Sequence, residues 1–164
     1  MTSDGVLLHA RERTVVAEKE NNINNNETAL VFLHGSYHAS WCYEEFFFEY
    51  FGKAGVDAFA MDFRGQGESG LPIKEENGRR VKEDEKVAGT VERHAMDVRE
   101  YVARIRERKT YKKVYVVGHS FGGLIAQKVF AEDGAEDGAE DGGGPGNIDG
   151  MILLASVPPT GNGE

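Results

Sequence analysis

The sequence has very little cysteine and no long hydrophobic run. Its single cysteine, Cys42, cannot form an internal disulfide, which is typical of a reducing compartment, and we expect it to be a small buried residue on a helix. No apolar run approaches the roughly 20 residues that a membrane-spanning helix requires. Residues Met1–Gly5 are polar and are not followed by the basic and apolar segments of a secretory signal. We therefore expect a cytoplasmic protein without a transmembrane segment.

The sequence also lacks an excess of basic residues. The formal net charge is −9, and six of the 28 acidic residues fall in three Ala-Glu-Asp-Gly repeats at 131–142. The rest of the chain carries 22 acidic and 19 basic residues, so its charge is nearly balanced. No basic stripe with interleaved aromatic residues is present, and we therefore expect no binding to nucleic acid.

The repeats continue into a glycine-rich segment, and the two together form a low-complexity insert at about 132–147. Such a composition offers little apolar area to bury, so we expect a disordered loop. A calcium site would need the loop register and the terminal bidentate glutamate of a calcium hand, and the insert has neither. No metal and no cofactor are expected. The length favours a single domain over residues 1–164 that includes this insert.

The most informative stretch is Val114–Gly123, a β-branched run that breaks at a glycine and continues into a helical pattern. It predicts a strand, a tight turn that presents Ser120, and a helix. Glycine is needed at 118 and 122, because a side chain two residues before or after the serine would collide with the turn. The helix would direct its free N–H groups at an anion that forms beside Ser120. The alternative is an ordinary glycine-rich connection between a strand and a helix.

Two further strand patterns precede this motif, and each ends in a glycine-containing loop. Ala29–Leu33 leads into His34–Trp41, and Val56–Met61 leads into Asp62–Ser69. The three signatures in this order resemble the α/β-hydrolase family, over about residues 29–159 without the insert. The resemblance implies an α/β fold with a mostly parallel sheet and helices on both faces, truncated after the sixth strand. The active site would then lie above the carboxyl ends of the strands.

The resemblance also implies roles for individual residues of this site. Ser120 would be the nucleophile, and the backbone N–H groups of Ser36 and Phe121 would form the oxyanion hole. Epoxide hydrolases and dehalogenases of this fold carry aspartate at the nucleophile position, so Ser120 argues against those chemistries.

Three other polar residues near these loops would have structural roles. His34 would orient its own loop, and Arg64 would hold the Asp62–Ser69 turn in place. His119, which is adjacent to Ser120 on an extended backbone, would project away from the serine.

The chain departs from the family after Ser120. In the family the order is serine, acid, histidine, because a serine hydroxyl needs a base to take its proton and a carboxylate to orient that base. No histidine follows Ser120, and neither Asp149 nor Glu164 lies where the family's acid follows a later strand. We interpret the chain as the N-terminal portion of an α/β hydrolase that is inactive on its own. If a base within these residues completes the site, His38 and His94 are the first candidates.

Two functions remain open from the sequence. The first is a serine hydrolase that cleaves carboxylic esters, such as acylglycerols, lysophospholipids or small esters, through an acyl-enzyme on Ser120. The second is a catalytically incomplete fragment or pseudoenzyme that binds a ligand or a partner. Thioesterase, peptidase and carbon–carbon hydrolase activities stay open within the first function, because substrate choice depends largely on a lid region that the chain lacks.

The remaining segments carry weaker patterns. Residues 6–16 predict one or two early strands, and residues 41–54 predict a helix with Ser40 as its N-cap and an aromatic face in the core. Residues 72–86 are charged and patternless and predict an exposed excursion. Cys42 belongs to the predicted helix.

A longer helix and a last strand complete the pattern. Apolar residues at 91, 95, 98, 102 and 105 predict a helix whose charged residues, including Asp97, form a solvated face, with His94 exposed or capped. Ile148–Ser156 predicts a fully buried sixth strand. Without a neighbouring strand, Met151–Ala155 would form an apolar edge, and we expect this edge to promote self-association.

Overall fold

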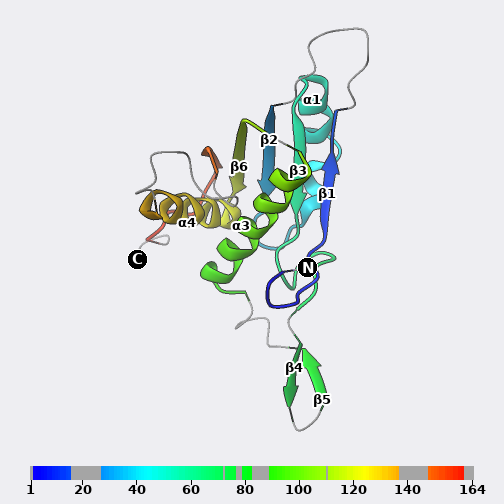
Figure 1. The fold of residues 1–164 in the computed structure, drawn as a ribbon, viewed down its shortest axis with the longest axis vertical. Helices are drawn as coiled ribbons and strands as arrows, with labels where there is room; N and C mark the ends of the chain where they lie inside the picture. Colours follow the sequence, from blue (N-terminus) through cyan, green and yellow to red (C-terminus); the bar gives the residue numbers. More distant parts are fainter. Residues whose placement is uncertain are drawn as a thin grey trace.

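The computed structural model describes residues 2–15, 27–71, 73–76, 79–82, 89–109, 111–136 and 148–160. Its main sheet has five strands, which lie in the order β1 (Ala10–Arg13), β3 (Asp57–Met61), β2 (Thr28–Leu33), β6 (Lys113–His119) and β7 (Gly150–Leu154). Strand β2 is parallel to β3 and β6, β6 is parallel to β7, and only β1 runs antiparallel to its neighbour. This mostly parallel sheet confirms the predicted fold class (Figure 1).

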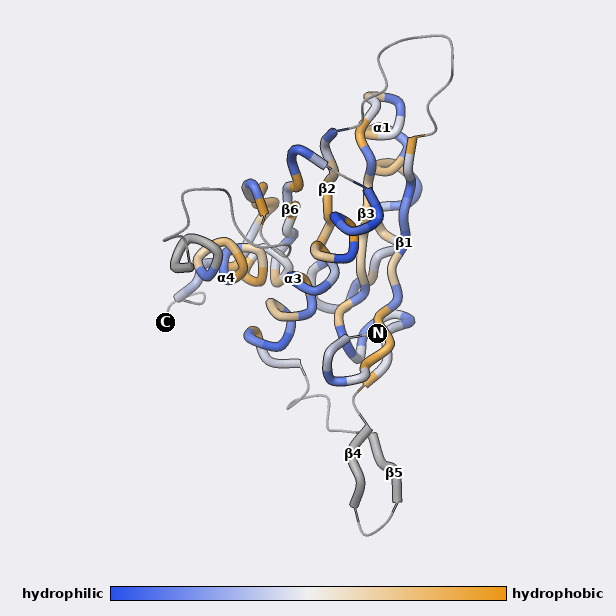
Figure 2. The backbone as a smooth tube through the Cα atoms, viewed as in Figure 1, coloured by the Kyte–Doolittle hydropathy of each residue, from blue (hydrophilic) through white to orange (hydrophobic). Residues whose placement is uncertain are grey.

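Helices cover both faces of the sheet, and the alternation of side chains along β2 shows how. Ala29, Val31 and Leu33 pack into a core with α3 (Val91–Arg108) and α4 (Phe121–Glu136). Leu30 and Phe32 point to the opposite face and pack against the short 3-10 helix η1 (Ser40–Tyr43) and α1 (Phe47–Lys53). A strand that is apolar on both faces belongs in the middle of a covered sheet. Figure 2 shows this difference between hydrophobic β2 and the mostly hydrophilic edge strand β1.

Helix α3 confirms the prediction made from its apolar spacing. The stripe residues Ala95, Val98, Val102 and Ile105 are buried in the sheet-facing core. The helix begins after Thr90, whose side chain accepts a hydrogen bond from the backbone N–H of Arg93 at 3.3 Å, as an N-cap residue does.

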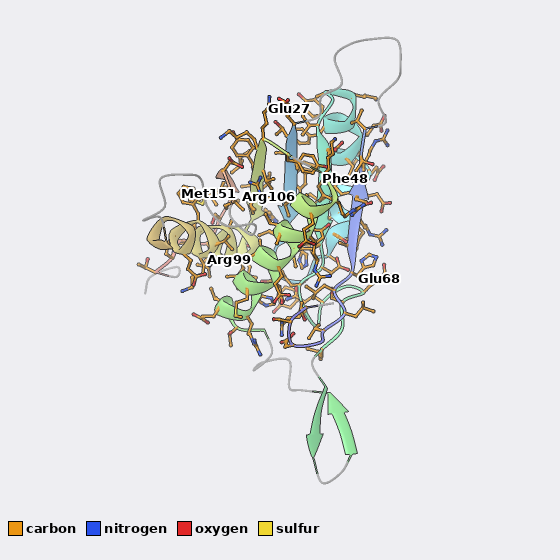
Figure 3. The ribbon with its side chains drawn as sticks, viewed as in Figure 1. Glu27, Phe48, Glu68, Arg99, Arg106 and Met151 are labelled. Carbon is orange, nitrogen blue, oxygen red and sulfur yellow. The ribbon has the colours of Figure 1, made fainter. Side chains whose placement is uncertain are left out.

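Two arginines of α3 connect the helix to its neighbours. The Arg106 guanidinium lies 2.7 Å from the Asp149 carboxylate just before β7, and Arg99 lies 3.8 Å from Glu132 of α4. Both arginines are labelled in Figure 3. The charged residues of α3 are therefore not all simply solvated, because some of them join elements that are distant in the sequence.

The region predicted as one helix over 41–54 differs from the prediction. It is divided into η1 and α1, and the N-cap position of η1 is Ala39 rather than Ser40. The aromatic face is only partly in the core: Tyr43 and Phe48 are buried, whereas Phe46 and Tyr50 are exposed. Cys42 lies on η1 and is partly exposed rather than buried. The break in the helix rotates the later aromatic residues away from the face that one continuous helix would have buried.

Three further segments also depart from expectation. The excursion at 72–86 contains an antiparallel pair of strands, β4 (Ile73–Glu76) and β5 (Arg79–Lys82), separate from the main sheet. Strand β7 is not fully buried, because Ile152 and Leu153 are exposed at the edge of the sheet. Helix α4 continues to Glu136 and so includes the first residues of the insert predicted to be disordered, whereas 137–147 lie outside the described residues.

Candidate active site

Ser120 lies at the junction between β6, which ends at His119, and α4, which begins at Phe121. Its backbone has φ of 53°, in the left-handed region that side chains disfavour. Neighbouring backbone holds it there: its N–H donates to the Leu154 carbonyl at 3.1 Å, and its carbonyl accepts from Gly123 and Val157 at 3.0 and 3.1 Å. Strain that surrounding structure maintains in this way is a frequent property of functional sites.

The two glycines of the motif are required by close backbone contacts. A Cβ on Gly118 would lie 2.5 Å from the carbonyl oxygen of Gly122, and a Cβ on Gly122 would overlap the carbonyl oxygens of Leu33 and His34. Real Cβ atoms do not approach backbone atoms so closely. The tight turn predicted from the sequence is therefore present, and it packs directly on the end of β2.

The loop after β2 lies against the serine. A Cβ on Gly35 would be 3.1 Å from Cβ of Ser120, so the structure brings the Gly35–Ser36 loop and the start of α4 together. Within the described ranges, neither the N–H of Ser36 nor that of Phe121 donates a hydrogen bond. The first N–H groups of a helix have no partner inside the helix, so Phe121 has a donor available for a ligand.

His34 holds this loop in place, as the resemblance implied. The imidazole is fully buried, its Nε2 accepts a hydrogen bond from the backbone N–H of Phe63 at 3.1 Å, and its Nδ1 donates to the Gly35 carbonyl at 2.8 Å. Burial lowers the pKa of His34, so the neutral ring that can both donate and accept is favoured. The first loop is thereby tied to the loop that follows β3.

Asp62 organises the turn after β3. Its buried carboxylate accepts hydrogen bonds from the backbone N–H of Glu68 at 2.9 Å and of Ser40, and it contacts His9 Nδ1 at 3.0 Å. Although burial alone would raise the pKa of Asp62, these hydrogen bonds hold it below the usual value, so the carboxylate is charged.

Arg64 anchors the same turn to α3, which agrees with the role expected for it. Its guanidinium is 3% exposed and donates from Nε to Asp97 Oδ2 at 2.7 Å, from a second nitrogen to Asp97 Oδ1, and to Asp4 Oδ2 at 2.9 Å. Hydrogen bonds with Asp97 raise the pKa of Arg64. The prediction that Asp97 is solvated is wrong, because it is 1% exposed and serves as the bidentate partner of Arg64.

His94 is also placed differently from the prediction. The ring is 1% exposed rather than solvent-facing, and it packs against the rings of Phe63 and Phe121 at centroid distances of 4.7 and 5.6 Å. Burial, with smaller contributions from Arg64 and His34, lowers the pKa of His94 to about 4. The neutral His94 ring therefore packs against Phe121, the aromatic residue that follows Ser120.

No histidine in the described part of the chain forms a hydrogen bond with the Ser120 hydroxyl. His34 and His9 bond to the groups named above, and His94 lies in the aromatic core. His119 turns toward the Gly35 loop: a Cβ on Gly35 would lie 3.1 Å from its Nδ1. The His119 ring is also 6.2 Å from that of His38, which is exposed on the loop. The structure thus does not place either candidate base, His38 or His94, against the serine hydroxyl.

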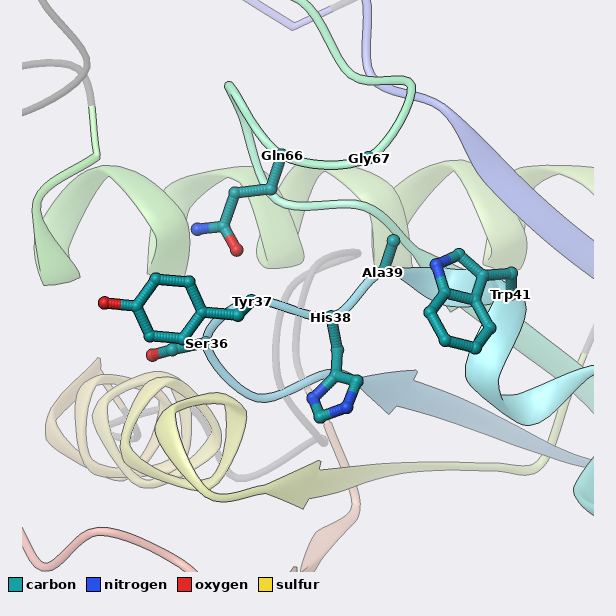
Figure 4. A pocket seen from close by; sticks show the side chains of 7 residues that line it. All are labelled: Ser36, Tyr37, His38, Ala39, Trp41, Gln66 and Gly67. Atoms are coloured by element: carbon teal, nitrogen blue, oxygen red, sulfur yellow. The ribbon is translucent and has the colours of Figure 1, made fainter.

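A cavity of about 560 Å³ opens beside this loop, at the carboxyl ends of β2 and β3. Its lining consists of Ser36, Tyr37, His38, Ala39, Trp41, Gln66 and Gly67 (Figure 4). Ligand sites of α/β folds occur at this edge of the sheet, and the volume is in the range of small-molecule pockets. Sequence reasoning identified Ser36 but missed the aromatic and amide groups around it, since their grouping depends on two loops that are distant in the chain.

Within the described residues, no group of three or more histidine, cysteine, aspartate or glutamate side chains is arranged to hold a metal ion. None of the described helices is both long and apolar enough to cross a membrane.

A family model described as serine aminopeptidase, S33, matches residues 24–158. The chain belongs to this α/β-hydrolase family. No curated protein sequence matches the chain.

Solved α/β hydrolases have the same fold. An esterase from Exiguobacterium antarcticum is 19% identical with a TM-score of 0.63, and the match covers 94% of this chain and 43% of the esterase. An epoxide hydrolase from Vigna radiata is 15% identical with a TM-score of 0.63, over 94% of this chain and 37% of the hydrolase. A monoacylglycerol lipase from Paleococcus ferrophilus is 18% identical with a TM-score of 0.60, over 92% and 44%. The chain therefore spans less than half the length of each of these three structures, and identities this low establish the fold alone.

Proposed function

We propose that this chain carries the nucleophile and oxyanion hole of a serine hydrolase that cleaves carboxylic esters. The observation that carries the proposal is the left-handed backbone of Ser120 at the start of α4, beside the Gly35–Ser36 loop. Serine rather than aspartate at this position favours acyl transfer, and acylglycerols, lysophospholipids and small esters are the proposed substrates. The esterase and lipase among the structural neighbours support an ester substrate.

The proposed reaction follows from the positions of these groups. The Ser120 oxygen attacks the ester carbonyl carbon while its proton passes to a base, and the carbonyl oxygen becomes an oxyanion. The N–H groups of Ser36 and Phe121 donate hydrogen bonds to that oxyanion. The intermediate then expels the alcohol, which takes the proton from the base, and water hydrolyses the acyl-enzyme. Because no histidine in the described ranges forms a hydrogen bond with the Ser120 hydroxyl, we propose that the base and its carboxylate partner come from outside residues 1–164.

A second function is favoured by the same observation about the histidines. A chain without a base in place can still bind a ligand in the cavity beside Ser36, so a binding module or pseudoenzyme is the alternative. The two functions differ in whether Ser120 forms a covalent bond.

The test is the rate at which a fluorophosphonate labels Ser120 in the purified chain. We expect slow labelling that maps to Ser120 by peptide mass spectrometry and is lost in Ser120→Ala.

The loop that contains Ser36 forms a tight turn, closed by the hydrogen bond from His38 N–H to the Gly35 carbonyl at 3.3 Å. Tyr37 has φ of 63° in this turn, which is a type II arrangement that accepts proline at position 36.

This turn supplies a matched pair of variants for the oxyanion hole. Ser36→Pro removes the N–H donor and Ser36→Ala keeps it, so we expect the former to slow labelling by about 10²–10³-fold and the latter to leave it unchanged. Equal labelling of Ser120→Ala would refute the nucleophile assignment. Equal rates in the two Ser36 variants would refute the oxyanion hole.

A further inference from the structure

The lining of the cavity beside Ser36 favours the small esters among the proposed substrates over acylglycerols and lysophospholipids. Of its seven lining residues, two are large aromatic residues, one is a histidine and one is a glutamine, and none is leucine, isoleucine, valine or methionine. A channel for a long acyl chain would be expected to present aliphatic side chains along its length. Rings and polar groups at the wall instead suit a flat ligand that stacks on a ring face.

Tyr37 combines a left-handed backbone with an exposed side chain beside the cavity. Its backbone is in the left-handed region, with φ of 63°, which is strained for a bulky residue. Its side chain is fully exposed, at 102%, so packing within the described protein does not repay that strain. Tyr37 lines one end of the cavity, next to Ser36 (Figure 4).

Trp41 faces the cavity from the other end. Figure 4 shows Tyr37 and Gln66 at one end, Trp41 at the other, and His38 between them. The indole is 57% exposed, and its ring lies 6.2 Å from that of His38. The Gln66 amide oxygen has no hydrogen-bond partner within the described ranges, so a polar group stands unpaired at the end opposite Trp41. Trp41 and Tyr37 therefore both present exposed ring faces that a ligand can contact.

We propose that this cavity is an aromatic subsite, which binds the planar ring of an aryl-substituted ester on the exposed ring faces of Tyr37 and Trp41. The inference deepens the proposed function, because Gly35 and Ser36 connect the cavity directly to Ser120. Ring recognition does not itself require catalysis, so it can be tested on the Ser120→Ala chain, in which no ester is cleaved through the serine.

The experiment compares two ligands that differ only in their ring, methyl phenylacetate and methyl cyclohexylacetate, with linear methyl octanoate as a third. Trp41 is the only tryptophan of the chain, so its fluorescence reports directly on the cavity. We expect the phenyl ester to quench it and to bind about three- to tenfold more tightly than the cyclohexyl ester, as stacking on one or two rings predicts.

Ligand-observed NMR measures the same preference in variants, including those without tryptophan. Tyr37→Leu and Trp41→Leu should each reduce the preference for the phenyl ring. Tyr50→Leu is the matched control, since Tyr50 is 69% exposed on α1 and does not line the cavity. Thermal unfolding checks that the variants stay folded, which is expected because both side chains lie outside the core.

Three results would overturn the inference: equal affinity for the two ring esters, tighter binding of methyl octanoate, or a phenyl preference that survives in both Tyr37→Leu and Trp41→Leu. Failure of the proposed function gives a different pattern. If a fluorophosphonate fails to label Ser120 while the ring preference and its loss in the variants are observed, the subsite stands and the catalytic role does not.

Discussion

The buried His94, which packs against the residue after Ser120, leads to a quantitative prediction about acid stability. The pKa of His94 is lowered from 6.5 to about 4 by burial. Between these two values the unfolded chain binds a proton on this residue and the folded chain does not, so the free energy of unfolding falls as the pH is lowered. A pKa difference of this size corresponds to a loss of about 3 kcal/mol, complete near pH 4.

Replacement by phenylalanine isolates this effect. His94→Phe keeps an aromatic ring against Phe63 and Phe121 and removes the hydrogen bond between the imidazole and the Gly89 backbone. Phenylalanine is larger than histidine, so we expect the free energy of unfolding above about pH 7 to fall by about 1–3 kcal/mol, as for an overpacked core substitution. The acid loss between about pH 6.5 and 4 should shrink by about 3 kcal/mol.

The assay is urea denaturation followed by circular dichroism at a series of pH values. Burial also lowers the pKa of His34, so the variant should retain part of the slope. For Asp4, hydrogen bonds with Arg64 and Thr2 outweigh burial and lower the pKa to about 2. Its contribution is therefore lost only below its ordinary value of 3.8, outside the histidine window. An unchanged slope in His94→Phe would refute the reasoning.

Two further predictions concern the Arg64 network and the sheet edge. Asp97→Ala should lower the free energy of unfolding by about 3–5 kcal/mol, because it leaves the buried Arg64 guanidinium with Asp4 as its one side-chain partner among the described residues. Glu92→Ala at the exposed face of α3 should cost less than about 1 kcal/mol, and similar losses for the two variants in urea denaturation would contradict this prediction. The exposed apolar edge at β7 should cause concentration-dependent self-association in sedimentation velocity. Ile152→Lys should weaken this association, since a lysine on an edge strand opposes pairing. An unchanged mass distribution in the variant would exclude this edge as the interface.

The parts of the structure that sequence reasoning predicted are those set by local pattern. The central strands follow from short apolar runs, helix α3 from a repeat of apolar residues at steps of three and four, and the turn at Ser120 from its flanking glycines. The Gly35 loop and the Asp62–Ser69 turn reach the site because parallel strands end at the same edge of the sheet. Their meeting therefore follows once the strand order is known.

The parts that were missed depend on partners distant in the chain. Asp97 and His94 have the sequence context of a solvated helix face, and their burial follows only from Arg64, Phe63 and Phe121, which come from other elements. Exposure of Ile152 depends on which strands flank β7, a property that its own apolar sequence does not reveal. The strands β4 and β5 gave no apolar alternation to detect.

The most direct test of the central claim is ester hydrolysis by the purified chain beside its Ser120→Ala variant. If the proposed oxyanion hole acts without a base against the serine, we predict slow release of 4-nitrophenol from 4-nitrophenyl acetate. The acceleration over water should be at most roughly 10³–10⁴-fold, as in a protease that has lost its triad. That acceleration should disappear in Ser120→Ala. An equal rate in the variant would contradict the assignment of Ser120 as the nucleophile.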